Sequence, residues 1–299
     1  MSFSLLFMLY CKRRKRRKRM NRLLLVDGSN LLFQMFFGMP ARIVNAQGKA
    51  IQGTLGFTGA LLKIIRMVEP THIAVLFDGE HANERSDANA DYKANRPDYS
   101  QMPEEETPFS QLPDVYAALD CLRIPHAETT DCETDDWMAA YARRYGMDHQ
   151  IVIASFDSDF FQLISQNVSV LRYRGKSTIV CTPDTIREKL QIEPAQYADF
   201  KALTGDSSDN LKGADKIGPK TAAMLLGQFG SLECILANVQ KISKPSIRES
   251  LIRCTARVLR NQQLIRLNGT AALPFEWHEM VYHAQGLTTR EVLKTIHLL

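Results

Sequence analysis

Short apolar runs alternate with helical segments through the first three-fifths of the chain. A short run of consecutive apolar residues is typical of a strand buried on both faces, and strands that alternate with helices are typical of a mostly parallel sheet. The predicted strands are 22–27, 72–77, 150–154 and 168–173, and the predicted helices between them include 54–68, 111–122, 134–145 and 159–165. The sequence therefore predicts an α/β fold with a central, mostly parallel sheet and flanking helices.

The strand pattern stops after about residue 183, and the rest of the chain reads as helical. The predicted helices here are 184–190, 195–203, 219–229 and 245–266. A chain of 299 residues is long enough for one large domain or two smaller ones. We expect a sheet domain over residues 21–183 and a smaller helical domain over residues 184–299.

A basic run near the N-terminus hides the charge of the rest of the chain. The formal net charge is +4, but Lys and Arg fill residues 12–19, so the remainder carries −4. We interpret residues 1–20 as a disordered basic extension, or as the result of a start codon assigned upstream of Met20. A nucleic-acid-binding arm and a nuclear-type address are the alternatives. Net charge alone therefore does not predict nucleic-acid binding.

Neither export nor membrane insertion is expected. No apolar run approaches the roughly 20 residues that cross a bilayer, and the first apolar stretch, 3–10, precedes the basic run, whereas a secretory signal has the reverse order. The six cysteines lack Cys-x-x-Cys spacing, so we expect reduced thiols in a cytoplasmic protein without structural zinc. They are Cys11, Cys121, Cys132, Cys181, Cys234 and Cys254.

Acidic residues gather where predicted strands end or predicted helices begin. Because the carboxyl ends of parallel strands meet at one edge of a sheet, most of these carboxylates should converge there. Crowded carboxylates need compensating cations, and two Mg²⁺ ions about 4 Å apart are an arrangement that cleaves phosphodiesters. The candidates are Asp27, Asp78, Glu133, Asp135, Asp136, Asp157, Asp159, Asp206 and Asp209.

Single members of this set also have ordinary structural explanations. Glu133 and Asp135 fit the first turn of a helix, where the helix dipole favours acids. Asp78 precedes a glycine, and Asp-Gly pairs are common in turns. Five acidic motifs at matching positions in the topology are harder to explain in this way, so we favour a metal site.

Two further segments stand out. Residues 79–110 form a long polar connection between a strand and a helix, and connections of this length are usually functional or disordered. Residues 213–223 place an Ile-Gly-Pro turn before a helix that begins with Lys220 and Thr221. A helix N-terminus with a lysine can bind a phosphate without reading a base, as a helix-hairpin-helix does, and an ordinary packing joint is the alternative.

Taken in order, these motifs resemble the bacterial and phage 5′-nuclease (flap endonuclease) family, and in particular the 5′–3′ exonuclease domain at the N-terminus of bacterial DNA polymerase I. The resemblance covers residues 21 to about 297, and because the chain ends there we expect a free-standing 5′–3′ exonuclease. The motifs are VDGSN (26–30), LFD (76–78), DYKANR (91–96), ETDD (133–136), DSDFFQL (157–163), ALTGDSSDN (202–210) and KIGPKTA (216–222).

The resemblance implies a PIN-like or Rossmann-like sheet domain with an arch over about 79–110. A helical domain with a helix-hairpin-helix motif (H3TH) at about 204–229 follows. It implies that Lys93 and Arg96 contact the scissile phosphate as catalytic residues. The other residues implied to contact DNA are Arg85, Tyr92, Lys216, Gly218, Lys220 and Thr221. A solvated lysine at position 93 and a core role for the Tyr92 ring are the alternatives.

The resemblance also assigns the acids to two metals. Asp27, Asp78, Glu133, Asp135 and Asp157 are expected around the first ion. Asp159, Asp206 and Asp209 are expected at the second, with Asp136 within reach. The implied cofactors are two or more Mg²⁺ ions, for which Mn²⁺ can substitute, with a K⁺ ion at the hairpin turn in some relatives. No small-molecule cofactor and no membrane partner are expected.

Three positions depart from the family pattern. Thr134 replaces the usual alanine between the acids, which should be tolerated. Ser158 removes a positive charge beside the metals. Lys216 stands where the hairpin usually has glycine, and if that position needs a positive φ, the turn is strained or remodelled.

The sequence therefore predicts a divalent-metal-dependent 5′–3′ exonuclease and 5′-flap endonuclease that acts on DNA with a 5′ flap, nick or free 5′ end in replication and repair. A monomer is expected. The alternatives are a PIN-like ribonuclease, which would not need the hairpin, and a non-catalytic binder of branched DNA, which would be expected to lack some of the acids. A nucleotide-binding Rossmann protein is disfavoured because no Gly-x-Gly-x-x-Gly follows the first strand.

Overall fold

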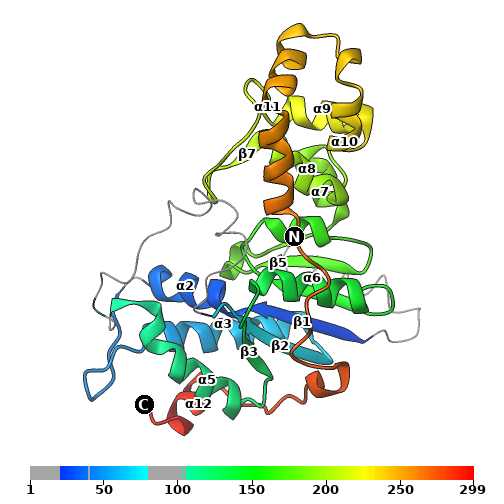
Figure 1. The fold of residues 1–299 in the computed structure, drawn as a ribbon. Coiled ribbons are helices and arrows are strands. Elements are labelled where there is room, and N and C mark those ends of the chain that lie inside the picture. Colours follow the sequence, from blue (N-terminus) through cyan, green and yellow to red (C-terminus); the bar gives the residue numbers. More distant parts are fainter. Residues whose placement is uncertain (1–20, 40, 80–102, 104–105) are drawn as a thin grey trace.

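The computed structural model describes residues 21–39, 41–79, 103 and 106–299. Its centre is a six-stranded sheet in the order β3-β2-β1-β4-β5-β6, in which β6 is antiparallel to β5 and the other neighbours are parallel (Figure 1). The strands are β1 (Arg22–Asp27), β2 (His72–Phe77), β3 (His126–Glu128), β4 (Gln150–Ala154), β5 (Val168–Arg172) and β6 (Ile179–Cys181). The predicted α/β fold with a mostly parallel sheet is confirmed.

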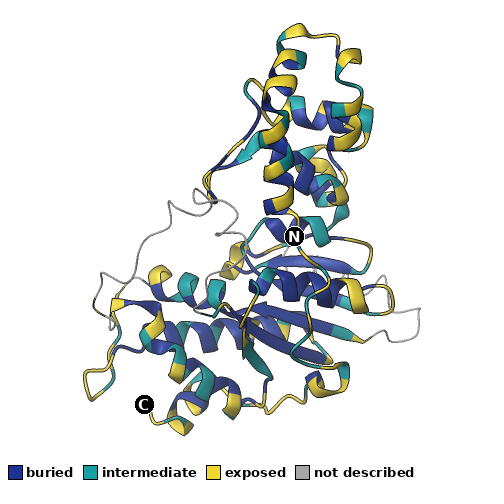
Figure 2. Ribbon diagram, in the orientation of Figure 1, coloured by how far each residue is buried: buried dark blue, intermediate teal, exposed yellow. Residues whose placement is uncertain are grey.

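The middle strand β1 shows why the sheet forms. All four of its central residues are fully buried, and successive side chains point to opposite faces. Leu23 and Leu25 belong to one core cluster, whereas Leu24 and Val26 belong to another. Helices cover both faces, so the central strands β1, β2, β4 and β5 are mostly buried, whereas the outer strands β3 and β6 are more exposed (Figure 2). A strand with apolar residues on both faces is stable only in such a sandwich.

The helices agree with most of the predicted ranges. The predicted helix over 159–165 is instead a short 3₁₀ helix, η4, because Phe161 N bonds to Ser158 O (2.9 Å) and Ile164 N to Phe161 O (3.3 Å). Helices α2, α10 and α12 were not predicted. The α-helices are α2 (Gly28–Gly38), α3 (Gln52–Val68), α5 (Leu112–Cys121), α6 (Thr134–Tyr145), α7 (Pro183–Leu190), α8 (Tyr197–Thr204), α9 (Pro219–Phe229), α10 (Leu232–Ala237), α11 (Pro245–Ile265) and α12 (Thr289–Thr295).

The remaining elements are short. A two-stranded antiparallel ribbon, β7–β8, follows α8 and carries two of the candidate acids near its turn. The ribbon strands are β7 (Gly205–Asp206) and β8 (Leu211–Lys212). The 3₁₀ helices are η3 (Pro108–Gln111), η4 (Asp159–Leu163), η5 (Gly175–Ser177), η6 (Pro194–Gln196), η7 (Val239–Lys241) and η8 (Trp277–Met280).

Two glycines make the β7–β8 ribbon possible. Gly205 has φ +85°, a conformation that favours glycine, and a Cβ on it would lie 2.6 Å from the Leu211 carbonyl oxygen. A Cβ on Gly213 would lie 2.3 Å from the Thr204 carbonyl carbon. The chain therefore enters and leaves the ribbon at a backbone-to-backbone contact that no other residue type permits.

The last 30 residues return from the helical region to the sheet domain. Val281 forms an isolated bridge with His72, and Tyr282 N donates to Thr71 O (2.9 Å). Helix α12 packs against α3 and α5, and the C-terminus lies beside them in Figure 1. The domain boundary at residue 183 stays a prediction, but these last residues contact the sheet domain.

Among the described residues, no helix is both long and apolar enough to cross a membrane.

Candidate metal centre

Asp27 lies at the carboxyl end of β1 and begins helix α2. One of its oxygens accepts a hydrogen bond from Asn30 N (2.9 Å), and the other accepts one from Ser155 Oγ (2.8 Å). Gly28 lets this helix start against β2, since a Cβ there would lie 2.5 Å from the Phe77 ring. Burial, together with the negative charges of Asp78 and Asp157, raises the pKa of Asp27 to about 7. The charged form of Asp27 is therefore unfavourable in the metal-free fold, and binding of a proton or a cation would stabilise this residue.

Asp78 lies at the end of β2 and reaches the start of α6. Its Oδ1 accepts a hydrogen bond from Thr134 N (2.9 Å), so the carboxylate that follows β2 binds a backbone N–H at the N-terminus of α6. Glu133 is buried at the N-cap position and Asp135 is half-buried in the first turn. Asp78 therefore lies at the N-terminus of α6, beside Glu133 and Asp135 in sequence order along that helix start. Among the described residues, however, the expected first-metal acids do not form a group whose oxygens all lie within 4.8 Å of one another.

Asp136 lies in the same turn, but one of its oxygens has a structural partner. It accepts a hydrogen bond from Asn268 N (2.8 Å), where the chain leaves the helical region. Asp136 is buried. It therefore ties the start of α6 to the returning segment.

Ser155 connects the acids of β1 to those that follow β4. Its hydroxyl donates to Asp27 and accepts from Asp157 N (3.0 Å). Asp157 Oδ1 in turn accepts from Asp159 N (2.8 Å). The two groups of carboxylates are thus joined by a short chain of hydrogen bonds.

Three of the predicted second-metal acids form a compact group. Asp159, Asp206 and Asp209 are all buried, and each offers a carboxylate oxygen within 4.8 Å of the others. Asp159 comes from η4 after β4, whereas the other two come from the β7–β8 ribbon. Burial and the charge of Asp157 raise the pKa of Asp159 to about 7, although Lys201 opposes this shift. We call Asp159, Asp206 and Asp209 the three-acid group.

Lys201, which we did not predict as a site residue, lies against the three-acid group. Its Nζ donates to Asp206 and lies 3.8 Å from Asp159 Oδ1, and its side chain is only 12% exposed. Burial alone would raise the pKa of Asp206, but hydrogen bonds from Lys201 and Ser208 lower it. The signal in the sequence was a lysine in a mostly apolar helix, five positions before Asp206.

The chemistry of these residues fits divalent cations. Asp159 Oδ1 is buried and accepts no hydrogen bond within the described part of the chain, which leaves it open to a cation. Carboxylate oxygens are the ligands that Mg²⁺ prefers. Crowded buried carboxylates raise one another's pKa, and a bound cation would relieve their mutual repulsion.

The predicted hairpin residues lie mostly on the surface, in and just before the first turn of α9. Lys216, Gly218 and Lys220 are exposed, and Thr221 is half-buried in the first turn of α9. The α9 N-cap residue is Gly218, which has no side chain to cap the helix. The backbone N–H groups of this turn can therefore face a phosphate.

Lys216 has the backbone conformation for which glycine is favoured. Its φ is +63°, a left-handed conformation that is unfavourable for a residue with a Cβ. The expectation that this turn would be strained by a non-glycine residue is consistent with this backbone. Lys93, Arg96, Arg85 and Tyr92 lie outside the described residues.

Two family descriptions match consecutive parts of the chain. Residues 22–191 match the 5′-3′ exonuclease, N-terminal resolvase-like domain. Residues 192–287 match the 5′-3′ exonuclease, C-terminal SAM fold.

Curated relatives include several DNA polymerases I. That of Lactococcus lactis is 34% identical over 261 residues, which cover 85% of this chain and 29% of the polymerase. That of Rhizobium leguminosarum is 35% identical over 281 residues, which cover 91% of this chain and 27% of the polymerase. This chain thus spans less than a third of the length of these relatives.

Solved structures share the fold. The T5 D15 protein co-crystallised with metal ions superposes with a TM-score of 0.68 at 23% identity, covering 83% of this chain and 90% of that one. The catalytic core of Rad2 in complex with DNA substrate gives a TM-score of 0.57 at 15% identity, covering 93% of each chain. Since the first family description alone matches more than half of the sequence, this chain belongs to the 5′–3′ exonuclease family.

Proposed function

We propose that this protein is a divalent-metal-dependent 5′–3′ exonuclease and structure-specific 5′-flap endonuclease that hydrolyses DNA phosphodiesters near a 5′ end. The observation that carries this proposal is the convergence of acids from β1, β2, β4 and the β7–β8 ribbon on one region. Membership of the 5′–3′ exonuclease family supports the same reaction.

The acids have distinct tasks in this proposal. Asp27, Asp78 and Asp157, with Glu133 and Asp135, would hold one ion, and the three-acid group would hold another. Bound Mg²⁺, for which Mn²⁺ can substitute, would supply an activated water and neutralise developing charge. The hydrogen bonds through Ser155 keep Asp27 and Asp157 in place before any ion binds.

The chain also offers groups for the DNA backbone. The exposed start of α9, with Lys220 beside it, suits a phosphate of the duplex. We propose that Lys93 and Arg96 orient the scissile phosphate, and that Arg85 and Tyr92 contact the same strand. Contacts of this kind bind DNA by its backbone and structure and not by its sequence.

Replacing single acids tests the proposal. Asp159→Asn should lower cleavage of a 5′-flap DNA in Mg²⁺ by at least about a thousandfold, because it removes a charged ligand of the three-acid group. DNA binding in EDTA should change little. Asp184→Asn is the matched control, since Asp184 is 83% exposed on α7, where it pairs with Arg187. Full cleavage by Asp159→Asn would refute the metal assignment.

The choice of substrate separates this proposal from its main alternative. The wild-type chain should cut flapped, nicked or gapped DNA in Mg²⁺ and lose this activity with a chelator. A preference for structured RNA would instead favour a PIN-like ribonuclease. Metal-independent binding of branched DNA without cleavage would favour a non-catalytic binder.

Three finer expectations belong to this proposal. The described cysteines form no disulfide with one another, and we expect reduced thiols in a cytoplasmic protein. We expect a monomer, which sedimentation can contradict. We also propose a K⁺ ion at the hairpin turn. If it is present, DNA affinity should fall when Li⁺ replaces K⁺ at equal ionic strength. Equal affinities in the two salts would exclude this ion.

A further inference from the structure

The three-acid group is assembled from two separate parts of the molecule. Asp159 belongs to η4 at the edge of the sheet, whereas Asp206 and Asp209 belong to the β7–β8 ribbon of the helical region. The distance between these carboxylates therefore depends on how η4 and the ribbon are held relative to each other. The inference below rests on the proposed metal-dependent function.

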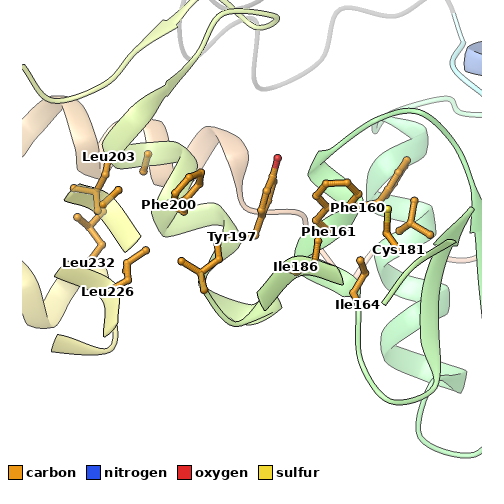
Figure 3. Packing of buried hydrophobic residues seen from close by; sticks show 14 of the residues in the cluster. Phe160, Phe161, Ile164, Cys181, Ile186, Tyr197, Phe200, Leu203, Leu226 and Leu232 are labelled. Atoms are coloured by element: carbon orange, nitrogen blue, oxygen red, sulfur yellow. The ribbon is translucent and has the colours of Figure 1, made fainter. Parts of the chain in front are cut away.

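Apolar packing joins η4 to the helical region that carries the ribbon. Figure 3 shows Phe160 and Phe161 of η4 on one side, facing Tyr197 and Phe200 of α8 on the other. The rings of Phe161 and Tyr197 are 5.3 Å apart, edge to face. Hydrophobic contact is non-directional, whereas hydrogen bonds have a defined geometry, so polar contacts between the two parts add to the packing in fixing the register.

Gln162 supplies such contacts on the η4 side. Its Nε2 donates to the carbonyl oxygen of Asp159 (2.9 Å) and to that of Ile265 at the end of α11 (3.0 Å). Its Oε1 accepts from Leu267 N (3.1 Å). One side chain thus binds the backbone of a three-acid residue and the last turn of α11.

Asn261 supplies the matching contacts on the ribbon side. This residue of α11 is only 4% exposed. Its Nδ2 donates to Ala202 O (3.3 Å), next to Lys201, and to Lys212 O (3.0 Å) in β8. Since β8 pairs with β7, the same amide holds both the ribbon and the helix that precedes it.

We propose that Gln162 and Asn261, which we call the amide clamp, are positioning residues that set the spacing of Asp159 from Asp206 and Asp209. The amide clamp does so by tying η4 and the ribbon to the same end of α11. The hydrogen bond from Asn268 N to Asp136 extends these ties to α6. Neither clamp side chain needs to contact an ion.

Metal coordination is sensitive to small changes in this spacing. Mg²⁺ requires oxygen ligands at about 2.0–2.1 Å in near-ideal octahedral geometry. Residues that orient the ligands without touching the ion typically change metal affinity by about 10–100-fold when replaced. Loss of the clamp should therefore weaken ion binding more than it weakens folding or DNA binding.

The test uses variants of similar shape that cannot donate or accept these hydrogen bonds. Gln162→Met and Asn261→Leu are made in the full chain. The control is Gln263→Met, because Gln263 is an exposed residue of α11, the helix that also carries Asn261. Mn²⁺ binding is measured by calorimetry without DNA, thermal unfolding is measured in EDTA, and binding of flapped DNA is measured in EDTA.

Each clamp variant should bind the second Mn²⁺ about 10–100-fold more weakly, and the control should not. DNA affinity in EDTA should stay within about threefold of wild type. In cleavage assays the Mg²⁺ concentration for half-maximal rate should rise, and excess Mg²⁺ should restore kcat, which a general structural defect would not allow.

Unchanged Mn²⁺ affinity in folded Gln162→Met overturns the proposal, and this half-buried position decides the matter if Asn261→Leu does not fold. Wild-type protein that binds no Mn²⁺ also overturns it. Wild-type protein that binds Mn²⁺ but cuts no DNA contradicts the proposed function and leaves the clamp standing, because ion binding is measured without a substrate.

Discussion

At the scale of single residues, Lys201 neutralises buried negative charge of the three-acid group. Its ammonium lies between Asp159 and Asp206, and its replacement by methionine would leave buried acids without this cation. We expect Lys201→Met to lower the free energy of unfolding in EDTA by about 2 kcal/mol. This lies below the usual loss for a broken buried pair, because Asp159 can take up a proton.

Chemical unfolding in EDTA and in Mg²⁺ measures this effect. A divalent ion should restore much of the lost stability, since it supplies the missing positive charge. Equal stability of Lys201→Met and wild type in EDTA would show that the lysine does not neutralise the three-acid group.

Lys216 combines a left-handed backbone conformation with a charge that we propose to contact DNA, and two substitutions separate the two effects. Lys216→Gly removes both the strained φ and the charge, whereas Lys216→Ala removes only the charge. The glycine variant should be about 1 kcal/mol more stable than the alanine variant, because a Cβ disfavours the left-handed conformation. Chemical unfolding measures the difference. Equal stability would show that the turn relaxes when lysine is absent.

At the scale of elements, two arginines of α11 form ion pairs with Asp215 in the loop before α9. Arg253 Nη2 lies 3.0 Å from Asp215 Oδ2, and Arg257 Nη1 lies 3.6 Å from Oδ1. Lys212 Nζ lies 4.0 Å from the same carboxylate. Arg253 and its neighbours hold the pKa of Asp215 below its usual range. Three cations beside the proposed duplex-binding turn are therefore partly neutralised by one acid.

Asp215→Asn should release these cations to DNA phosphates. We expect duplex affinity near 0.1 M KCl to rise about threefold and the slope of log Kd against log salt to steepen by about one. Fluorescence anisotropy over a KCl series measures both, with Asp184→Asn as the control. Weaker binding would mean that the carboxylate is needed to shape the loop.

At the scale of the whole molecule, local patterns predicted the elements better than their arrangement. The acids were found because strand ends are visible in sequence and parallel strands share an edge. Strands β3 and β6 have three residues each, too few to show a pattern. Lys201 looked like an ordinary helix residue because the fold is needed to bring Asp159, from a distant part of the chain, to its other side.

The returning C-terminal segment was missed for a related reason. Thr288 and Glu291 form a capping box at α12, which is a local signal, but nothing local indicates that α12 packs against α3 and α5. The same holds for the Asn261 and Gln162 contacts, which join residues about 50 to 100 positions apart. Polar contacts between residues distant in sequence cannot be predicted until the fold is known.

The stability of the whole molecule should depend on pH through its buried acids. Asp27 and Asp159 have pKa values of about 7 in the folded chain against 3.8 without these shifts. Between these values the folded state binds more protons than the unfolded state, so their contribution is complete below pH 4 and is lost as the pH rises through 7. Burial lowers the pKa of His72, which acts in the opposite direction over part of this range.

The comparison must therefore be made against a variant that lacks only the two acids. In EDTA, raising the pH from 5.5 to 8 should lower the Tm of wild type by about 5 °C more than that of Asp27→Asn/Asp159→Asn. Mg²⁺ competes with protons for the same oxygens, so it should raise the wild-type Tm more at pH 8 than at pH 5.5. Calorimetry at both pH values measures this. An equal fall in the Tm of wild type and variant in EDTA would show that these carboxyls are already ionised in the metal-free fold.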